Sequence, residues 1–430
     1  MEIRPFRGWR YVGRDGNDIG PFIAPPYDVL TGADKDRLLD GCPENIVAVD
    51  LPHVPPKQLG TDAEYEQAAR QLETWKSDGV LRQDVKPCIY VYEQTYTCSG
   101  KTYVRRGMFA GVRATELGQD VIPHEHTFSG PIADRFKLTE VTRTQLSPIF
   151  GFYEDADGAV GEILAGAASK EPQAIGELNG VTEKLWTIDD EAVIATIARA
   201  LGDKPVFIAD GHHRYTTTLG YGRQLQESGE ITSDSEANFV MFALVAKDDP
   251  GLVILPTHRL FSDLDPGGSV EKLAESLPEF SWKKLGPADI GADGLEKLLD
   301  DSPPSTMAFI SGTGTELWLA DLVKPEAMLT VAPDESDTWR ALPSAVISKL
   351  IIDKGLKQWT PDGSPTVEYT ASIAEAIEAC RAGRAQLAVC LKGIAIEAVE
   401  AIALAGASMP HKSTYFYPKI ATGMVLKPLL

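Results

Sequence analysis

The feature that most restricts the fold is a regular alternation of strand-like and helix-like runs between residues 155 and 261. Short apolar runs indicate buried strands, whereas apolar residues three and four positions apart indicate amphipathic helices. Helices that alternate with strands cover the faces of a sheet, so we predict a mixed α/β (α+β) fold of layered mixed sheets with flanking helices. The expected order is helix 158–169, strand 182–188, helix 189–201, strand 205–209, a helix from 212 or 215 to 228, and strands within 238–246 and 251–261.

The regions on either side continue the pattern, and 430 residues are too many for one core of ordinary size. Four regions are expected: an N-terminal α+β region at 1–154, an α/β core at 155–261, a smaller α/β unit at 262–340 and a C-terminal α/β region at 341–430. The further elements expected are helices 62–79, 133–146, 268–277, 292–300, 343–353, 371–382 and 394–405, strands 147–155, 366–370 and 385–391, and hairpins within 87–114 and 306–320.

The charge balance limits the kinds of partner. With 41 Lys and Arg against 62 Asp and Glu, the net charge is -21. Such a surface repels phosphate backbones and anionic lipids, so neither nucleic acid nor membrane is expected as a partner. The first residues carry no apolar signal core, and the five scattered cysteines form no C-x-x-C pair. We therefore expect a cytoplasmic protein with reduced thiols; the composition gives no oligomeric state.

The run VFIADGHHRY places polar residues directly after a buried strand. Asp210 and Gly211 form the expected turn, and the helix that follows offers unpaired backbone N–H groups to an anion. The guanidinium of Arg214 suits a phosphate or carboxylate, and His212 and His213 can donate hydrogen bonds or exchange protons. The alternative is that Asp210 caps the helix and the histidines are ordinary surface groups.

A metal site is a second interpretation of the histidines. Adjacent helical residues point about 100° apart, so His212 and His213 do not readily bind one ion. In the run PHEHTFSGPIADR, an extended backbone would place His124 and His126 on one face, with Glu125 pointing away. That segment is interpreted as a base or phosphate-contacting loop, as part of a composite metal site, or as a polar surface loop.

Two more loops pair histidine with a basic residue: His258-Arg259 follows a strand, and His411-Lys412 lies in the aromatic and polar tail. Six of the seven histidines fall in these four loops, and His is followed by Lys or Arg three times. Composition alone predicts about 0.7 such pairs. In an acidic chain, this local concentration of positive groups predicts a pocket for a small anionic or phosphorylated metabolite, with the tail folded over it.

Other motifs carry no function. The run SGTGTE at 311–316 lies between two expected strands and is interpreted as a hairpin turn. The sequence contains no G-x-x-x-x-G-K-[ST] phosphate loop and no G-x-S-x-G nucleophile elbow.

Six ordered blocks resemble the domain of unknown function 1015 family: APPYDV, PHEHTFSGPIADR, LSPIFGFY, ADGHHRY, LPTHR and MPHKSTYFYPK. The run Gly211 to Arg214 is also similar to the phosphate-binding helix start of the ParB/sulfiredoxin superfamily, which includes free serine kinases. That likeness implies a ParB/sulfiredoxin-like core, with His213 and Arg214 on phosphate. His212 replaces the reactive cysteine of sulfiredoxin, which argues against sulfinic-acid repair.

The main hypothesis is a phosphoryl-transfer enzyme that acts on a small polar metabolite such as an amino acid or hydroxy acid, with ATP or ADP and Mg²⁺. Two alternatives stay open: a metal-dependent hydrolase using His124 and His126, and a non-catalytic regulator that binds a phosphometabolite. The catalytic candidates are Asp210, His212, His124 and Glu125; phosphate is assigned to Gly211, His213, Arg214 and Lys412. Substrate binding is assigned to His126, Arg135, His258, Arg259, His411, Tyr27 and Asp28.

Overall fold

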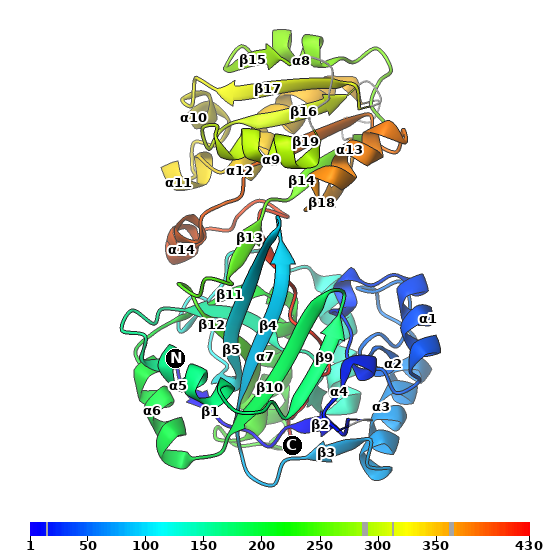
Figure 1. Cartoon of the computed structure of the whole chain (residues 1–430), viewed down its shortest axis with the longest axis vertical. Coiled ribbons are helices and arrows are strands. Elements are labelled where there is room, and N and C mark those ends of the chain that lie inside the picture. The colour runs from blue at the N-terminus through cyan, green and yellow to red at the C-terminus, as the bar shows by residue number, and fades with distance from the viewer. Residues whose placement is uncertain (14–15, 286–290, 312–313, 361–364) are drawn as a thin grey trace. The chain divides into compact units, whose positions relative to one another are not determined.

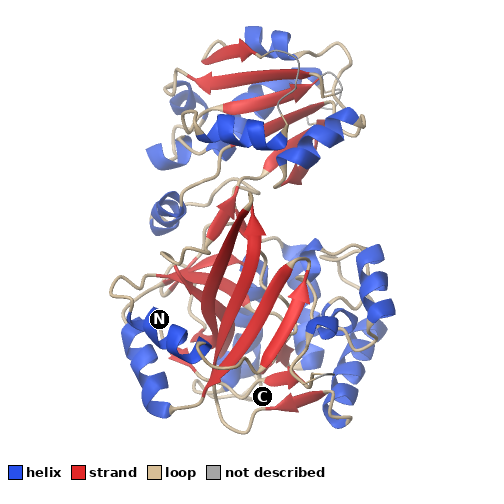
Figure 2. Ribbon diagram, in the orientation of Figure 1, coloured by secondary structure: helices blue, strands red, loops and turns tan. Residues whose placement is uncertain are grey.

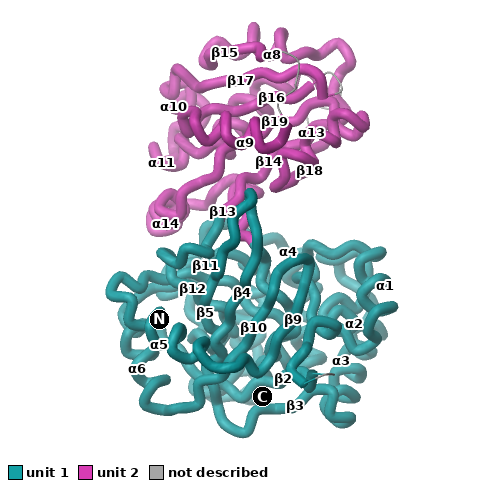
Figure 3. The backbone as a smooth tube through the Cα atoms, in the orientation of Figure 1, with its two compact units in different colours: residues 1–253, 418–430 teal, residues 254–417 magenta. Residues whose placement is uncertain are grey.

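The computed structural model describes residues 1–13, 16–285, 291–311, 314–360 and 365–430. The chain forms two compact units, one made of Met1–Val253 with Pro418–Leu430 and the other of Ile254–Tyr417. Figure 3 shows the two units in separate colours. No helix in the described ranges combines the length and the apolar character that crossing a bilayer requires.

Unit 1 is built on a nine-stranded sheet in the order β6-β11-β8-β12-β5-β4-β10-β9, with β1 paired to β5 (Figure 1). Neighbouring strands run antiparallel except for the parallel pairs β6–β11 and β8–β12. The strands are β1 (Ile3–Arg4), β4 (Ile89–Cys98), β5 (Lys101–Arg113), β6 (Val121–Ile122), β8 (Ile149–Tyr153), β9 (Ala174–Leu178), β10 (Val181–Ile188), β11 (Val206–Asp210) and β12 (Phe239–Ala246).

Helices of unit 1 pack apolar stripes against this sheet. In α6 (Glu191–Leu201) the buried residues Ile194, Ile197 and Leu201 recur at helical spacing, and the Asp190 carboxylate caps the first turn. The other helices and short strands are α1 (Gly32–Gly41), α2 (Val47–Asp50), α3 (Asp62–Ser77), α4 (Ser129–Thr142), α5 (Ala159–Ala168), α7 (His212–Glu227), the 3₁₀ turns η1 (Gly20–Phe22), η2 (Tyr27–Val29) and η3 (Glu236–Asn238), β2 (Trp9–Tyr11), β3 (Leu81–Gln83), β7 (Thr144–Gln145) and β21 (Lys427–Pro428).

Unit 2 has a six-stranded sheet in the order β15-β17-β16-β19-β14-β18. Its strands are β14 (His258–Ser262), β15 (Phe280–Lys284), β16 (Met307–Ser311), β17 (Glu316–Leu322), β18 (Thr366–Thr370) and β19 (Leu387–Leu391). Its helices are α8 (Val270–Ser276), α9 (Ala292–Asp300), α10 (Ala327–Val331), α11 (Asp337–Arg340), α12 (Pro343–Val346), η4 (Ile347–Gly355), η5 (Leu356–Trp359), α13 (Ile373–Arg381) and α14 (Ile396–Leu404). Two short strands, β13 (Val253–Leu255) and β20 (Tyr415–Tyr417), lie where the chain passes between the units.

The predicted fold class is confirmed, because helices flank β-sheets in both units (Figure 2). The sheet of unit 1 is mixed, whereas the strand pairs described in the unit 2 sheet are antiparallel. The predicted hairpin at Ser99-Gly100 joins β4 to β5. One expected helix differs: the segment 343–353 is α-helical only in α12 and continues as the π-helix η4. The centre of the expected SGTGTE turn, residues 312–313, lies outside the described residues.

The division into units differs from the expected regions. The expected boundary after residue 154 falls inside unit 1, because β8 pairs with β12 and β11 in one sheet. The boundary after residue 340 falls inside unit 2, since α11 and α12 belong to the same unit. Sequence alternation locates the elements but does not reveal which strands share a sheet.

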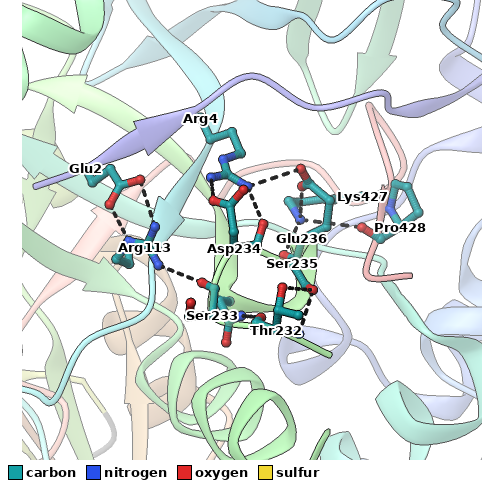
Figure 4. A network of polar contacts seen from close by, with 11 residues as sticks. Glu2, Arg4, Arg113, Thr232, Ser233, Asp234, Ser235, Glu236, Lys427 and Pro428 are labelled. Atoms are coloured by element: carbon teal, nitrogen blue, oxygen red, sulfur yellow. Dashed lines mark hydrogen bonds and ion pairs between the residues drawn. The ribbon is translucent and has the colours of Figure 1, made fainter. Parts of the chain in front are cut away.

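The last residues of the chain return to unit 1. Lys427 is fully buried, and its ammonium contacts both the backbone oxygen and the carboxylate of Glu236, each at 2.9 Å. Figure 4 shows this contact beside the ion pairs of Arg4 with Asp234 and of Arg113 with Glu2. The network joins β1, the turn before β12 and the C-terminal segment. These contacts anchor the C-terminal segment in unit 1.

Candidate functional site

The candidate site begins at a sharp turn between β11 and α7. Asp210 ends the strand, and Gly211 adopts the left-handed conformation with φ of 99° before the helix starts at His212. A β-carbon on Gly211 would lie 3.0–3.1 Å from the guanidinium of Arg214. Glycine is therefore required at position 211 for two reasons: the left-handed backbone conformation, and the lack of space for a β-carbon beside Arg214.

Asp210 is held between two cations. Nη2 of Arg214 lies 2.7 Å from Oδ2, and the Lys419 ammonium bonds Oδ1. Burial acts to raise the pKa of Asp210, but the attraction of Lys419 and Arg214 outweighs it and holds the pKa well below its usual range. Asp210 is thus ionised at neutral pH. It does not cap α7, so the alternative interpretation of Asp210 as a helix cap is wrong.

The start of α7 keeps its backbone donors. Gly211 is the capping residue, and no side-chain hydrogen bond caps the first turn in the part of the chain that the structure describes. The helix dipole adds partial positive charge at the same place. Lys419 and Arg214 carry two positive charges against the one negative charge of Asp210. The turn therefore brings two cations and a helix start together in an acidic protein.

His124 and His212 form a buried pair behind the turn. The backbone N–H of His124 donates to Nε2 of His212 at 3.2 Å, and the two rings meet edge to face at 4.8 Å. The proton of neutral His212 is therefore on Nδ1, which lies 3.8 Å from Oε2 of Glu125. Burial lowers the pKa of His124 to about 4 and that of His212 well below its ordinary value. Both imidazoles are neutral at pH 7.

His213 faces the more open side of the turn. Its Nε2 accepts the backbone N–H of Phe128 at 2.9 Å, and the exposed Phe128 ring stacks on it. The remaining nitrogen, Nδ1, carries the proton of the neutral ring and can donate. Burial lowers the pKa of His213, and Lys57 lowers it further, while Asp28 acts in the opposite direction. Lys57 was not expected here from the sequence.

The expected alternation of the histidine loop is wrong. The strand β6 ends at Ile122 and the backbone bends at Glu125, so residues 124–126 are not extended. His124 is buried and Glu125 approaches His212, whereas His126 is exposed. His124 and His126 therefore do not share a face. Among the described residues, no group of three or more His, Cys, Asp or Glu side chains is arranged to hold a metal ion.

Arg135 lies next to the turn but is tied to its own partners. Its Nη1 donates to the backbone oxygen of Asp50 at 2.6 Å, and its Nε donates to Asp134 at 2.9 Å. Its guanidinium stacks on the ring of Tyr27 at 3.8 Å. Oδ1 of Asp28, in the same turn as Tyr27, is buried and has no hydrogen-bond partner within the described part of the chain. The predicted residues Tyr27, Asp28 and Arg135 thus border one polar region of unit 1.

Lys419 reaches Asp210 because buried polar groups hold the returning segment. Nε2 of Gln94 donates to the backbone oxygen of Lys419 at 3.1 Å. Arg105, which is fully buried, bonds both the Gln94 amide oxygen and the backbone oxygen of Pro418. These contacts fix the backbone on both sides of Lys419. The sequence block MPHKSTYFYPK contains both Lys412 and Lys419, and the sequence alone does not show which of the two lysines reaches Asp210.

A buried carboxyl completes this anchor. Glu183 accepts hydrogen bonds from the Tyr92 hydroxyl at 2.5 Å and from Nε2 of Gln94 at 3.0 Å. The Tyr92 oxygen in turn accepts the backbone N–H of Ala421 at 3.3 Å. Burial raises the pKa of Glu183 to about 7 despite these donors. A glutamate on a β-rich run gives no sequence signal of such a role.

The other two histidine motifs meet in unit 2. Arg259 donates to the backbone oxygen of Lys412 at 3.2 Å, and its guanidinium lies 5.7 Å from the ring of Tyr369. His411 packs against the same ring edge to face, and Nδ1 of His258 accepts the backbone N–H of Leu391 at 3.1 Å. The predicted residues His258, Arg259, His411 and Lys412 therefore lie in unit 2. They do not take part in the contacts described around Asp210 in unit 1.

Comparisons with known proteins cover five of the six sequence blocks, and MPHKSTYFYPK at 409–419 lies beyond the matched residues. The profile of a protein family of unknown function (DUF1015) matches residues 3–343. The chain belongs to this family. A search of curated proteins finds no match.

Among solved structures, a free serine kinase in complex with AMP is similar at 12% identity and a TM-score of 0.34, over 71% of this chain and 86% of that one. A conserved hypothetical protein from Pyrococcus furiosus is similar at 13% identity and a TM-score of 0.35, over 75% and 97%. SbnI with a C-terminal truncation from Staphylococcus aureus is similar at 10% identity and a TM-score of 0.37, over 75% and 87%.

Proposed function

We propose that this protein is a phosphoryl-transfer enzyme that acts on a small polar metabolite, such as an amino acid or hydroxy acid, at the turn between β11 and α7. The observation that carries the proposal is the arrangement at Asp210: an ionised carboxylate between Lys419 and Arg214, beside an uncapped helix start. Phosphoryl transfer depends on positioning and on stabilising negative charge, and this arrangement supplies groups for both.

The phosphate would lie at the first turn of α7. There the backbone N–H groups, the Nδ1–H of His213 and the Lys419 ammonium all offer donors or positive charge. Arg214 steadies Asp210 and adds charge behind the turn. This assignment keeps Gly211, His213 and Arg214 from the sequence analysis and gives the role of the tail lysine to Lys419.

We assign two groups, Asp210 and Glu125, to orient an acceptor hydroxyl and to take its proton. Asp210 is ionised and accepts hydrogen bonds only, so it can orient a hydroxyl; its lowered pKa makes it a weak base that takes the proton only late in the transfer, when the hydroxyl has become strongly acidic. Glu125 lies beside the neutral His212, whose Nδ1–H can stabilise developing negative charge. Buried His124 holds His212 in this tautomer through its backbone.

ATP or ADP fits the cationic turn as the phosphate-bearing partner, and when bound it would supply the phosphoryl group or accept it. Mg²⁺ usually keeps several waters and binds through phosphates with one or two carboxylates, so it would come with the nucleotide. Asp28, whose buried Oδ1 has no hydrogen-bond partner in the described ranges, is the carboxylate we assign to steady it.

The test is calorimetric titration of the purified protein with ATP, ADP and phosphoserine. We expect at least one of them to bind, and we expect binding to weaken about tenfold or more in Lys419→Met, since a charge-assisted contact is lost. Lys170→Met, which removes an exposed lysine of unit 1 outside the turn, serves as the control and should bind as the wild type does. A folded protein that gives no heat with any of the three ligands would remove the proposal.

A further inference from the structure

A second polar cavity lies in unit 1 and is lined in part by Arg214. It has a water-accessible volume of about 40 Å³ and lies between α4, α7 and the start of β12. A volume of this size admits only a very small ligand. Arg135, Arg214 and Asp50 line it together with hydroxyl and amide side chains.

One wall carries a buried donor without an acceptor. Gln145 is 7% exposed and lines the cavity, and its Nε2 has no hydrogen-bond partner among the residues that the structure describes. The orientation of its amide is fixed, because Oε1 accepts the backbone N–H of Met241 at 2.6 Å. A buried amide donor is unfavourable unless something accepts its hydrogen bond.

The cavity also offers acceptors. The Thr139 hydroxyl donates to the backbone oxygen of Arg135 at 2.8 Å, and the Thr218 hydroxyl donates to that of Arg214 at 3.0 Å. With their hydrogens used, both hydroxyl oxygens can accept from a ligand. The lining thus combines an orphan amide donor and two guanidinium groups with hydroxyl acceptors and the Asp50 carboxylate.

We propose that this cavity binds a small hydroxy acid or amino acid, with its carboxylate on Gln145 and the adjoining arginines and its hydroxyl or ammonium group on the threonine oxygens. The inference deepens the proposed function, since it names the class of the acceptor and makes Gln145 a specificity-determining residue. The role of the bound acid as phosphoryl acceptor rests on the proposed function, whereas its binding in the cavity does not.

The experiment is a ligand-observed NMR titration of the full chain with L-lactate, L-serine and lactamide, without nucleotide or phosphate. We expect L-lactate or L-serine to bind at least about tenfold more tightly than lactamide, because carboxylates form stronger charge-assisted hydrogen bonds. Lactate and serine that bind no better than lactamide would overturn the proposal.

Variants test the named residue. Gln145→Glu keeps an oxygen for the Met241 N–H but removes the orphan donor, so affinity for L-lactate or L-serine should fall about tenfold or more. Gln226→Glu, which changes a glutamine of α7 that lines a different cavity, is the matched control. If Gln145→Glu does not fold, Thr218→Val tests the opposite wall, and unchanged affinity there would contradict the assignment.

The outcomes separate this inference from the proposed function. Carboxylate binding that depends on Gln145, without any phosphoryl transfer, would support the cavity and count against the enzyme. Nucleotide or phosphoserine binding without selective carboxylate binding would leave the phosphate site in place and remove the cavity as a ligand site.

Discussion

The two units contain the same local pattern, a histidine followed by a basic residue after a strand or in a loop, but they use it differently. In unit 1, Arg214 and Lys419 meet the carboxylate of Asp210, and Arg135 meets that of Asp134. In unit 2, buried Arg259 is held by the backbone oxygens of Thr257 and Lys412, and no ion pair to it is found in the described ranges. Burial lowers the pKa of Arg259 to about 10.

The difference follows from where the pattern falls in the fold. His212, His213 and Arg214 occupy the first turn of a helix, where they surround free backbone donors. His258 and Arg259 begin strand β14, where successive side chains point to opposite faces of the sheet. A helix start directs its unpaired backbone N–H groups toward one place, whereas the backbone groups of a strand are used in pairing with neighbouring strands. The anion site is therefore expected in unit 1.

The largest effect should come from the buried histidine pair of unit 1. The pKa of His124 falls from 6.5 to about 4 on folding, so the neutral ring adds stability above pH 6.5 that is lost as the pH falls toward 4. At about 1.4 kcal/mol per pKa unit, the stability difference between wild type and His124→Gln should change by about 3 kcal/mol over this window. Urea unfolding at several pH values measures it, and a constant difference would contradict a buried neutral His124.

Glu183 should act with the opposite sign and similar size. Its pKa rises from 4.5 to about 7 on folding, so the wild type loses stability as the pH increases through this range. Glu183→Gln removes the titration and should gain about 3 kcal/mol relative to wild type between pH 4.5 and pH 7. Urea unfolding of both proteins at several pH values measures this difference in stability. If the variant shows no such gain, Glu183 is not the buried titrating group that anchors the returning segment.

Gly211→Ala should disrupt the turn itself. The substitution forces a β-carbon into the left-handed region and against the Arg214 guanidinium, which we expect to cost about 2 kcal/mol of folding free energy. Gly220→Ala is the control within the same helix, because its added methyl group would lie at an ordinary 3.7 Å from the ring of Phe136. It should stabilise slightly. Equal thermal shifts for the two variants would show that the turn is not strained as described.

Comparison of the variants Lys412→Met and Lys419→Met shows which lysine of the C-terminal region binds phosphate. Affinity for ADP, measured by calorimetry, should fall about tenfold in Lys419→Met, which corresponds to about 1.4 kcal/mol. It should change less than about twofold in Lys412→Met. The reverse order would transfer the anion site to unit 2.

Much of the fold could be predicted because strand and helix periodicities are local. Helix α6 and the β4–β5 hairpin lie where their apolar patterns place them. The strand–turn–helix at Asp210 could also be predicted, since Asp-Gly after a buried strand is a local signal. Pairing between distant segments could not: the carboxylate partner of Lys419 lies 209 residues away in sequence. The bend at Glu125 that separates His124 from His126 likewise depends on tertiary contacts with His212.

The most direct test of the central claim is a crystal structure with tungstate, a phosphate analogue with a strong anomalous signal, followed by displacement with ADP. We predict one displaceable anomalous peak within hydrogen-bonding distance of the backbone nitrogens of His212, His213 and Arg214 and of the Lys419 ammonium. A peak at Arg259 and Lys412 with none at the start of α7 would contradict the account.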